Sequence, residues 1–247
     1  WHSLDRTIDI ENGQIRLDGE YIGQTRPEMV TESARGFEYD GSPSPSGHTN
    51  NGYVPDASAL SPEFREFLET NPDLELGPDG VVRPTEPIYV EVNGPTSSHP
   101  YEHYRQAAEQ QAQMREYSVQ DLEKNIDTYN SAAAEVRDAR ASGREVSETA
   151  LRDMLADQHP HLSVAEIDDI VRDVKAETDA THRLDGKAGG DVTDISGLGH
   201  QGANRSLGGK WPSTTPGLLD DLRAVLDQIP PEFRGDVRPN IVFVVKP

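Results

Sequence analysis

The segment that decides how this chain is organised runs from His182 to Trp211 and reads HRLDGKAGGDVTDISGLGHQGANRSLGGKW. It combines imidazole, carboxylate, amide, hydroxyl and cationic side chains with many glycines, and no other part of the sequence has a comparable chemical density. A polar, glycine-rich run of this length is typical of loops rather than of a hydrophobic core. We therefore expect a site-bearing loop between a helical segment and a final helix and strand.

The segment before it, residues 101–183, has helical spacing throughout and a single proline, Pro160. A helix is expected over about 100–116, and three serines are expected to cap further helices: Ser118, Ser147 and Ser163, the last in a capping box with Glu166. If the last helix continues far enough, His182 and Asp185 share one face near its C-terminal end, because they are three residues apart.

The ends of the chain supply the remaining elements. Apolar spacing over 218–229 predicts an amphipathic helix, and residues 240–245 read as a buried strand. Before residue 97, short strands are expected: a hairpin around Asn12-Gly13, a second over 74–82 and a strand over 87–92. A short helix capped by Ser61 and a linker over 41–52 separate them. The predicted fold class is α+β.

The expected domain organisation has two parts. Residues 1–96 form a proline- and glycine-rich N-terminal extension with short strands, and residues 97–247 form a helix-rich domain with a glycine-rich catalytic loop and a C-terminal strand. No catalytic constellation is recognisable in the extension. A wrapping or delivery-related role is the interpretation that we give it.

Composition limits the function classes. The net charge is −21, and residues 1–100 carry 18 acidic and 6 basic side chains, so non-specific coating of nucleic acid is disfavoured. A local cationic groove on an enzyme is not excluded by this charge. The chain has no cysteine, hence no disulfide or thiolate zinc site. No apolar run approaches the roughly 20 residues that cross a bilayer.

His182 and Asp185 are the first candidates for chemistry. A carboxylate can orient an imidazole, or both can hold a divalent cation, and the imidazole can accept a proton near neutral pH. The alternative is structural: His182 meets a helix dipole and Asp185 caps a turn. His159 and His161, in a helix connection, are interpreted as structural.

Further polar residues follow in the glycine-rich segment. Asp191 and Asp194 add hard oxygen ligands of the kind that suits Mg²⁺, or else they form ordinary Asx turns. Arg205 and Lys210 are candidates for phosphate contacts, and Asn204 and Ser206 for orienting a ligand; each is equally compatible with a turn. Trp211 reads as a hydrophobic anchor. Gly197-Leu198-Gly199 and Gly208-Gly209-Lys210 could let backbone N–H groups approach a phosphate, but no loop of the form GxxxxGK[ST] is present.

Two blocks of the sequence resemble the polymorphic toxin type 15 family, the HxxD-type nuclease toxins at the C-termini of bacterial effectors. The likeness covers roughly residues 97–247. One block begins at Tyr104-Arg105-Gln106 and continues through Ser118-Val119-Gln120-Asp121-Leu122. The second and more specific block joins four motifs: His182-x-x-Asp185, Ala188-Gly189-Gly190-Asp191, Ile195-Ser196-Gly197-Leu198-Gly199 and Asn204-x-Ser206-x-Gly208-x-x-Trp211.

The resemblance implies metal-dependent DNA cleavage with His182 and Asp185 as the catalytic residues. The expected cofactor is a divalent metal, Mg²⁺ first with Mn²⁺ or Zn²⁺ as alternatives, and the expected ligands are Asp185, Asp191 and His200. Asn204, Arg205, Ser206 and Lys210 are the expected substrate-binding residues. His200 stands where we expect an acidic residue; if that position ligates the metal, imidazole shifts its preference from Mg²⁺ toward softer ions.

This resemblance also implies partners and a location. A toxin of this kind acts on DNA in the cytoplasm of a target cell after delivery by a bacterial secretion system, and its producer needs a neutralising immunity protein. The acidic surface predicts basic patches on that protein. Two alternatives stay open: a non-catalytic acidic interaction module, and a toxin that acts on RNA or on a nucleotide. The enzyme reading requires His182 and Asp185 to converge on an accessible pocket beside Arg205 or Lys210.

Overall fold

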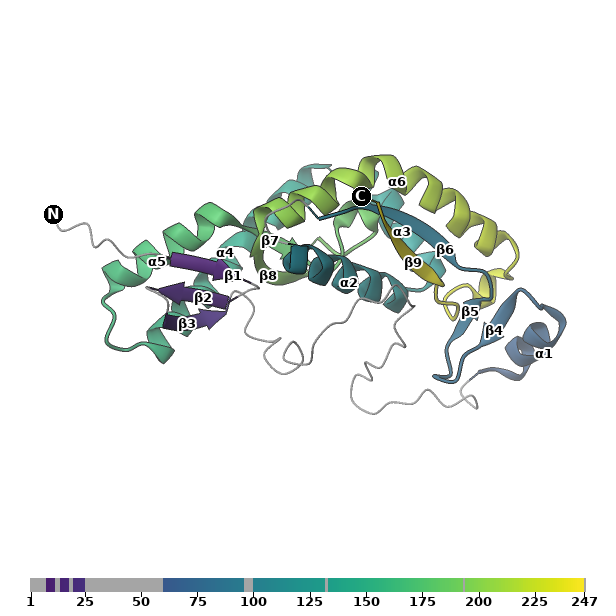
Figure 1. Ribbon diagram of the computed structural model, residues 1–247. Helices are drawn as coiled ribbons and strands as arrows, with labels where there is room; N and C mark the ends of the chain where they lie inside the picture. Colours follow the sequence, from purple (N-terminus) through teal and green to yellow (C-terminus); the bar gives the residue numbers. More distant parts are fainter. Residues whose placement is uncertain are drawn as a thin grey trace.

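The computed structural model of the chain describes residues 8–11, 14–17, 20–24, 60–95, 100–131, 133–192 and 194–246. This part is helix-rich α+β, as predicted (Figure 1). The helices are α1 Pro62–Thr70, α2 Pro100–Glu116, α3 Val119–Ser131, α4 Ala133–Gln158, α5 Val164–Glu177 and α6 Gln201–Asp227, with 3-10 turns η4 Gly186–Ala188 and η5 Pro231–Phe233. The strands are β1 Ile8–Glu11, β2 Gln14–Leu17, β3 Glu20–Gln24, β4 Leu74–Leu76, β5 Val82–Pro84, β6 Ile88–Asn93, β7 Thr178–His182, β8 Ile195–His200 and β9 Ile241–Lys246.

Helix starts follow the predicted capping chemistry at three of four serines. Ser61 and Ser163 accept hydrogen bonds from Phe64 N and Glu166 N, and Ser118 Oγ accepts one from Asp121 N at 3.0 Å. The expected start at Ser147 is wrong, because α4 runs through it. Leu151 and Leu155, which follow on the same helix, are buried against α5, and such packing overrides the weak preference of an interior serine for a cap.

The helix that starts at Ser163 does not reach His182. It ends at Glu177, and residues 178–182 form β7, which pairs antiparallel with β8. Thr178 begins the strand by donating its backbone N–H to Val174 O, and β-branched Thr178 and Thr181 suit a strand better than a helix. The expectation that His182 and Asp185 share a helix face is therefore wrong.

The glycine-rich segment is a loop only in its first part. Residues 183–192 and 194 belong to the loop with η4, residues 195–200 form β8, and residues 201–211 are the first turns of α6. The helix forms because Ala203, Leu207 and Trp211, each four residues from the next, are buried along one side. Residues 201–211, which we expected to be part of a loop, therefore contribute to the core. The helix expected over 218–229 is the second half of α6.

The C-terminal strand is confirmed, and its partner comes from far away in the sequence. β9 pairs in parallel with β6, in a register that places Ile88 opposite Ile241. Helical side chains satisfy backbone groups at both edges of this two-stranded sheet: Phe243 N donates to Gln111 Oε1 at 2.6 Å, Arg115 Nε donates to Ile241 O at 2.8 Å, and Thr214 Oγ1 donates to Glu91 O at 3.1 Å. These contacts explain how so small a parallel sheet is stable.

The short N-terminal elements also follow prediction. β1 and β2 form the antiparallel hairpin expected around residues 12–13, and β4 and β5 form the second hairpin. The predicted linker over 41–52 lies outside the described residues. In the described part of the chain, no helix combines the length and the apolar character needed to span a membrane.

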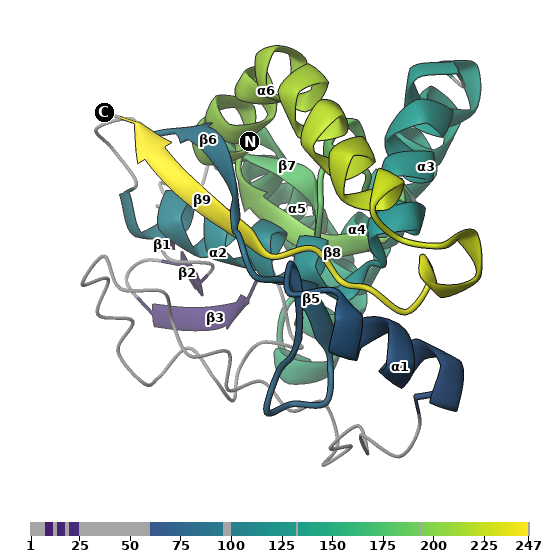
Figure 2. The ribbon, with the colours of Figure 1, turned by 90° about the vertical axis from the view of Figure 1, so that its right-hand side faces the viewer.

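Two hydrophobic cores flank the β7–β8 hairpin. The larger core joins α1, β4–β6, α2, α3, α6 and β9, and it includes Leu184 and Ala188 from the loop after β7. The smaller core joins α4 and α5 to the β1–β3 sheet and includes Leu198 of β8. Figure 1 shows the β1–β3 sheet beside α4 and α5 at one end and the β4–β5 hairpin with α1 at the other; Figure 2 views the molecule from the α1 end. The hairpin and its loop therefore lie between the two cores.

Candidate active site

His182 is placed by the end of strand β7. In the hairpin, Thr181 lies opposite Gly197 and His182 opposite Ile195, so the register shifts by one residue between them. A bulge of this kind changes the direction in which a side chain leaves the strand. His182 thus stands where regular pairing stops and the loop that begins at Arg183 starts.

The imidazole of His182 is oriented by the backbone of that loop. Its Nε2 lies 3.1 Å from Val192 O. Because a carbonyl oxygen only accepts, Nε2 is the donor and carries the ring proton. In the neutral ring the lone pair is then on Nδ1, which makes Nδ1 the atom for accepting a proton or ligating a metal. The side chain is half-buried.

Asp185 is fixed at the start of η4. One carboxylate oxygen, Oδ1, accepts the backbone N–H of Lys187 at 2.9 Å, so Asp185 does cap a turn, as its structural alternative predicted. The other oxygen, Oδ2, faces α6: a Cβ added at Gly208 would lie 3.1 Å from it. The absence of a side chain at residue 208 therefore lets this carboxylate approach the helix.

Three glycines allow the loop to hold this shape. A Cβ at Gly190 would lie 1.9 Å from Leu184 O, and one at Gly186 would lie 2.6 Å from the ring of Tyr129. Gly189 has φ +93°, a left-handed conformation that favours glycine, and a Cβ added there would lie 2.6 Å from Leu122 Cδ1. The glycines are therefore needed for close backbone approach, and they give the loop a defined conformation.

The other carboxylates of the loop have different surroundings. Asp191 is exposed, and its backbone N–H donates to Tyr117 Oη at 3.4 Å. Burial raises the pKa of Tyr117 and outweighs the hydrogen bond from the Asp191 backbone, which lowers it. Asp194 forms an ion pair with Arg183 at 3.1 Å, which joins the two ends of the loop.

The predicted substrate-binding residues lie on different sides of α6. Ser206 and Lys210 are directed toward β6: Ser206 O accepts from Asn93 Nδ2 at 2.9 Å, and Lys210 Nζ lies 3.9 Å from Glu91. Arg205 forms an ion pair with Asp179 of β7 at 3.1 Å.

Helical geometry separates these residues further. Residue 204 is one turn before Gly208 and so shares its side of the helix, whereas residues 206 and 210 are on the opposite side. The structure therefore brings Asn204 onto the side that faces Asp185, and it does not bring Ser206 and Lys210 there. Their roles in substrate binding stay predictions.

His200 has a structural role at the other end of the hairpin. Its Nδ1 accepts the N–H of Gly202 at 3.1 Å and so caps α6. It lies opposite Thr178, four residues along β7 from His182, a separation of about 13 Å at about 3.3 Å per residue. His200 is thus not brought next to Asp185.

The donor set for a metal ion is correspondingly small. Within the described ranges, no group of three or more His, Asp or Glu side chains could hold a metal ion. One carboxylate from Asp185 and one imidazole from His182 do not fit a zinc site made by protein alone. They fit Mg²⁺, which binds through one or two carboxylates and completes its shell with waters and phosphate oxygens.

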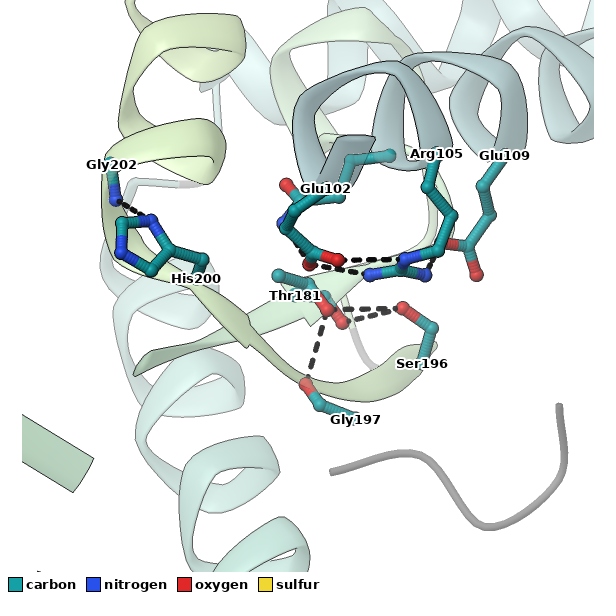
Figure 3. Close-up of polar contacts among 9 residues, drawn as sticks. Glu102, Arg105, Glu109, Thr181, Ser196, Gly197, His200 and Gly202 are labelled. Atoms are coloured by element: carbon teal, nitrogen blue, oxygen red, sulfur yellow. Dashed lines mark hydrogen bonds and ion pairs between the residues drawn. The ribbon is translucent and has the colours of Figure 1, made fainter. Parts of the chain in front are cut away.

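A buried ion pair on α2, which sequence reasoning missed, packs against the same hairpin (Figure 3). Arg105 Nε donates to Glu102 Oε2 at 2.8 Å, and Gln106 Nε2 donates to Glu102 Oε1 at 2.7 Å. Burial would lower the pKa of Arg105, but its hydrogen bond to Glu102 and the nearby carboxylates raise it overall. Figure 3 shows the pair beside Thr181 and Ser196.

The position of this pair depends on a glycine. A Cβ at Gly199 would lie 2.8 Å from Gln106 Nε2 and 3.0 Å from Glu102 Oε1. In the sequence, Glu102, Arg105 and Gln106 have the spacing of a solvated helix face, and nothing marks them as buried. Only the tertiary contact with β8 does so.

The predicted structural roles of Trp211 and His159 are confirmed. Trp211 is fully buried, and its indole N–H donates to Gln110 Oε1 at 3.2 Å, so it is a hydrophobic anchor. His159 Nε2 donates to Ile22 O at 2.7 Å and joins the helix connection to β3.

The loop, the hairpin and the helices around them are those of a polymorphic toxin domain. The sequence matches the model of the Ntox15 family, novel toxin 15, over residues 98–234, which is more than half of the chain. The chain therefore belongs to the novel toxin 15 family. A search of curated proteins finds no match.

Proposed function

We propose that this toxin domain is a nuclease that hydrolyses phosphodiester bonds of DNA, with His182 and Asp185 at its active site and a divalent metal ion, Mg²⁺ first. The observation that carries the proposal is the fixed geometry of the HxxD pair: Val192 O orients the His182 ring through Nε2, and Lys187 N holds Oδ1 of Asp185. The cap of η4 uses only Oδ1 of Asp185, and Oδ2 faces α6 at Gly208 instead.

The roles follow from the chemistry of the two side chains. His182 accepts a proton from the attacking water through Nδ1, and its Nε2 bond to Val192 O keeps the ring in place while it does so. Asp185, with the exposed Asp191 on the same loop, would hold the metal ion. When bound, the ion supplies Lewis-acid polarisation of the phosphoryl group. His200 has no part in this proposal, because it caps α6 at the far end of the hairpin.

The biological setting belongs to the same proposal. The domain is delivered by a bacterial secretion system and acts on DNA in the cytoplasm of the target cell, and its producer makes an immunity protein that binds it. The charge of −21 favours basic patches on that protein.

The experiment is cleavage of supercoiled plasmid by the purified chain with Mg²⁺, with Mn²⁺ or with EDTA. His182→Ala and Asp185→Ala are run beside it, with His161→Ala as the matched control because His161 is an exposed histidine in the α4–α5 connection. Nicking that needs metal, persists in the control and is lost in both site variants supports the proposal. Intact plasmid together with degraded RNA in a parallel assay would change the substrate, and inactivity on both would contradict the proposal.

A further inference from the structure

Cations next to the His182–Asp185 loop are mostly neutralised by carboxylates. Arg183 pairs with Asp194 at 3.1 Å. Arg205 pairs with Asp179 at 3.1 Å, and Asp179 also binds Arg144. Lys210 Nζ lies 3.9 Å from Glu91. A cation that already faces a carboxylate attracts a phosphate less, because the two charges largely cancel at a distance.

Lys187 is different. It is half-buried on η4, two residues after Asp185, and no carboxylate in the described part of the chain lies within 4.0 Å of its ammonium group. Its Nζ instead lies 3.4 Å from a neutral acceptor, the carbonyl oxygen of Gly208. The chain has a net charge of −21, so carboxylates are plentiful. It therefore needs an explanation that Lys187, only two residues from Asp185, forms no ion pair with any residue that the structure describes.

The Gly208 carbonyl is available because of Pro212. In a helix, the oxygen of residue 208 normally accepts from the N–H of residue 212, but proline has no N–H. Lys187 Nζ occupies the place of that donor. The backbone of Lys187 is also held, since its N–H donates to Asp185 Oδ1 at 2.9 Å and its carbonyl accepts from Thr215 Oγ1 at 3.0 Å.

Both side chains therefore meet α6 at the same residue. Oδ2 of Asp185 would lie 3.1 Å from a Cβ at Gly208, and Nζ of Lys187 lies 3.4 Å from the Gly208 oxygen. Lys187 is thus a positive charge held beside the carboxylate of the candidate site. Only one of its three N–H donors is used by the Gly208 carbonyl, so it has donors for a further ligand.

We propose that Lys187 is a catalytic residue that donates to a non-bridging oxygen of the phosphate cleaved at the His182–Asp185 site, an inference that rests on the proposed function. Negative charge on the phosphoryl oxygens must be stabilised during transfer, and a positioned cation does this without reorganisation. Arg205 and Lys210, the cations expected from the sequence, are tied to Asp179 and Glu91 instead.

The test compares Lys187→Met and Lys187→Ala with Lys124→Met, which removes the same charge from an exposed position on α3. Plasmid cleavage is measured under single-turnover conditions, and thermal unfolding is measured in parallel. We expect Lys187→Met to lower the maximal rate about 100-fold or more with little change in the melting temperature. Lys124→Met keeps the rate of the unaltered chain, and methylammonium in solution restores part of the activity of Lys187→Ala.

Other outcomes overturn the assignment. If Lys187 only braces the helix at Pro212, Lys187→Met lowers the melting temperature, the rate at low temperature is unchanged and methylammonium has no effect. Cleavage that is lost in His182→Ala but kept in Lys187→Met overturns the role of Lys187 alone. Absence of any cleavage by the unaltered chain overturns the proposed function, and the role of Lys187 with it.

Discussion

Asp185 and Gly208 meet across the space between the loop and α6, where a Cβ at residue 208 would lie 3.1 Å from the Asp185 Oδ2 atom. This separation is tighter than ordinary van der Waals contact, so an added methyl group must displace the carboxylate. The geometry of the candidate site therefore depends on a residue that has no functional group of its own.

Gly208→Ala is accordingly expected to lower nuclease activity at least about 10-fold, because a small misplacement of a catalytic group is costly. Its effect on the free energy of unfolding is small, since alanine favours a helix by up to about 1 kcal/mol over glycine. The matched control is Gly209→Ala, where nothing lies within 4 Å of the new Cβ. Equal activities of the two variants, measured by plasmid nicking, would show that the contact is irrelevant.

Gly190→Ala is expected to destabilise the fold. Its Cβ would lie 1.9 Å from Leu184 O, and neither backbone segment can move without disturbing Leu184, which is buried in the larger core. We expect a loss of more than about 2 kcal/mol in the free energy of unfolding, measured in urea. Gly217→Ala is the control, because its new Cβ meets nothing within 4 Å. A Gly190→Ala variant as stable as the control would mean that the loop has another conformation.

Trp211→Phe tests the anchor of α6. The substitution keeps an aromatic ring in the core but removes the indole N–H, which leaves the Gln110 Oε1 acceptor buried without its donor. We expect a loss of about 1–3 kcal/mol in the free energy of unfolding. Trp211→Phe combined with Gln110→Leu removes both partners, and the double variant should recover part of this loss. Additive losses would contradict a direct bond between the two side chains.

His103 predicts how stability depends on pH. Burial lowers the pKa of His103 below its usual 6.5, although its bond to Asn93 O opposes this. At pH values below 6.5 the unfolded chain binds a proton that the folded chain does not, so stability falls as the pH drops through that value. One such group contributes at most about 1.4 kcal/mol per pH unit.

The variant His103→Gln isolates this contribution. Glutamine can donate to Asn93 O as His103 does at 2.7 Å, but it does not titrate. Urea unfolding at pH 7.5 and at pH 5 should therefore show a smaller loss of stability in the variant than in the unaltered chain. An equal loss in both would assign the pH dependence to other groups.

Local signals in the sequence predicted most helices and hairpins. Ser118 and Ser163 act as caps through bonds to residues only three positions away, and apolar spacing places Ile167, Ile170 and Val174 in one stripe. These features depend on short-range geometry, which the sequence contains directly. Pairing of β6 with β9 joins residues about 150 positions apart, and no local pattern specifies such a partner.

The errors have one cause, which is that tertiary contacts decided between local alternatives. Residues 201–211 contain helix-disfavouring glycines, yet burial of Leu207 and Trp211 makes them helical. β7 replaces the end of a predicted helix because β8 is available to pair with it.

The candidate site was predictable as a motif but not as an arrangement. His182 and Asp185 stand out by type and spacing, whereas their supports do not: Val192 O and the Gly208 contact are backbone features. Lys187 reads as an ordinary loop cation until the ion pairs of Arg205 and Lys210 are known.

The most direct measurement of the central claim is single-turnover cleavage of a labelled DNA duplex by Asp185→Asn, with thermal unfolding of the same sample. The amide oxygen of asparagine can still accept from Lys187 N, as Asp185 Oδ1 does at 2.9 Å, so the turn is kept while the negative charge is removed. We predict an unchanged melting temperature and a cleavage rate at least about 100-fold below that of the unaltered chain in Mg²⁺. Full cleavage by a normally folded Asp185→Asn variant would contradict the account, because Asp185 would then be only a cap.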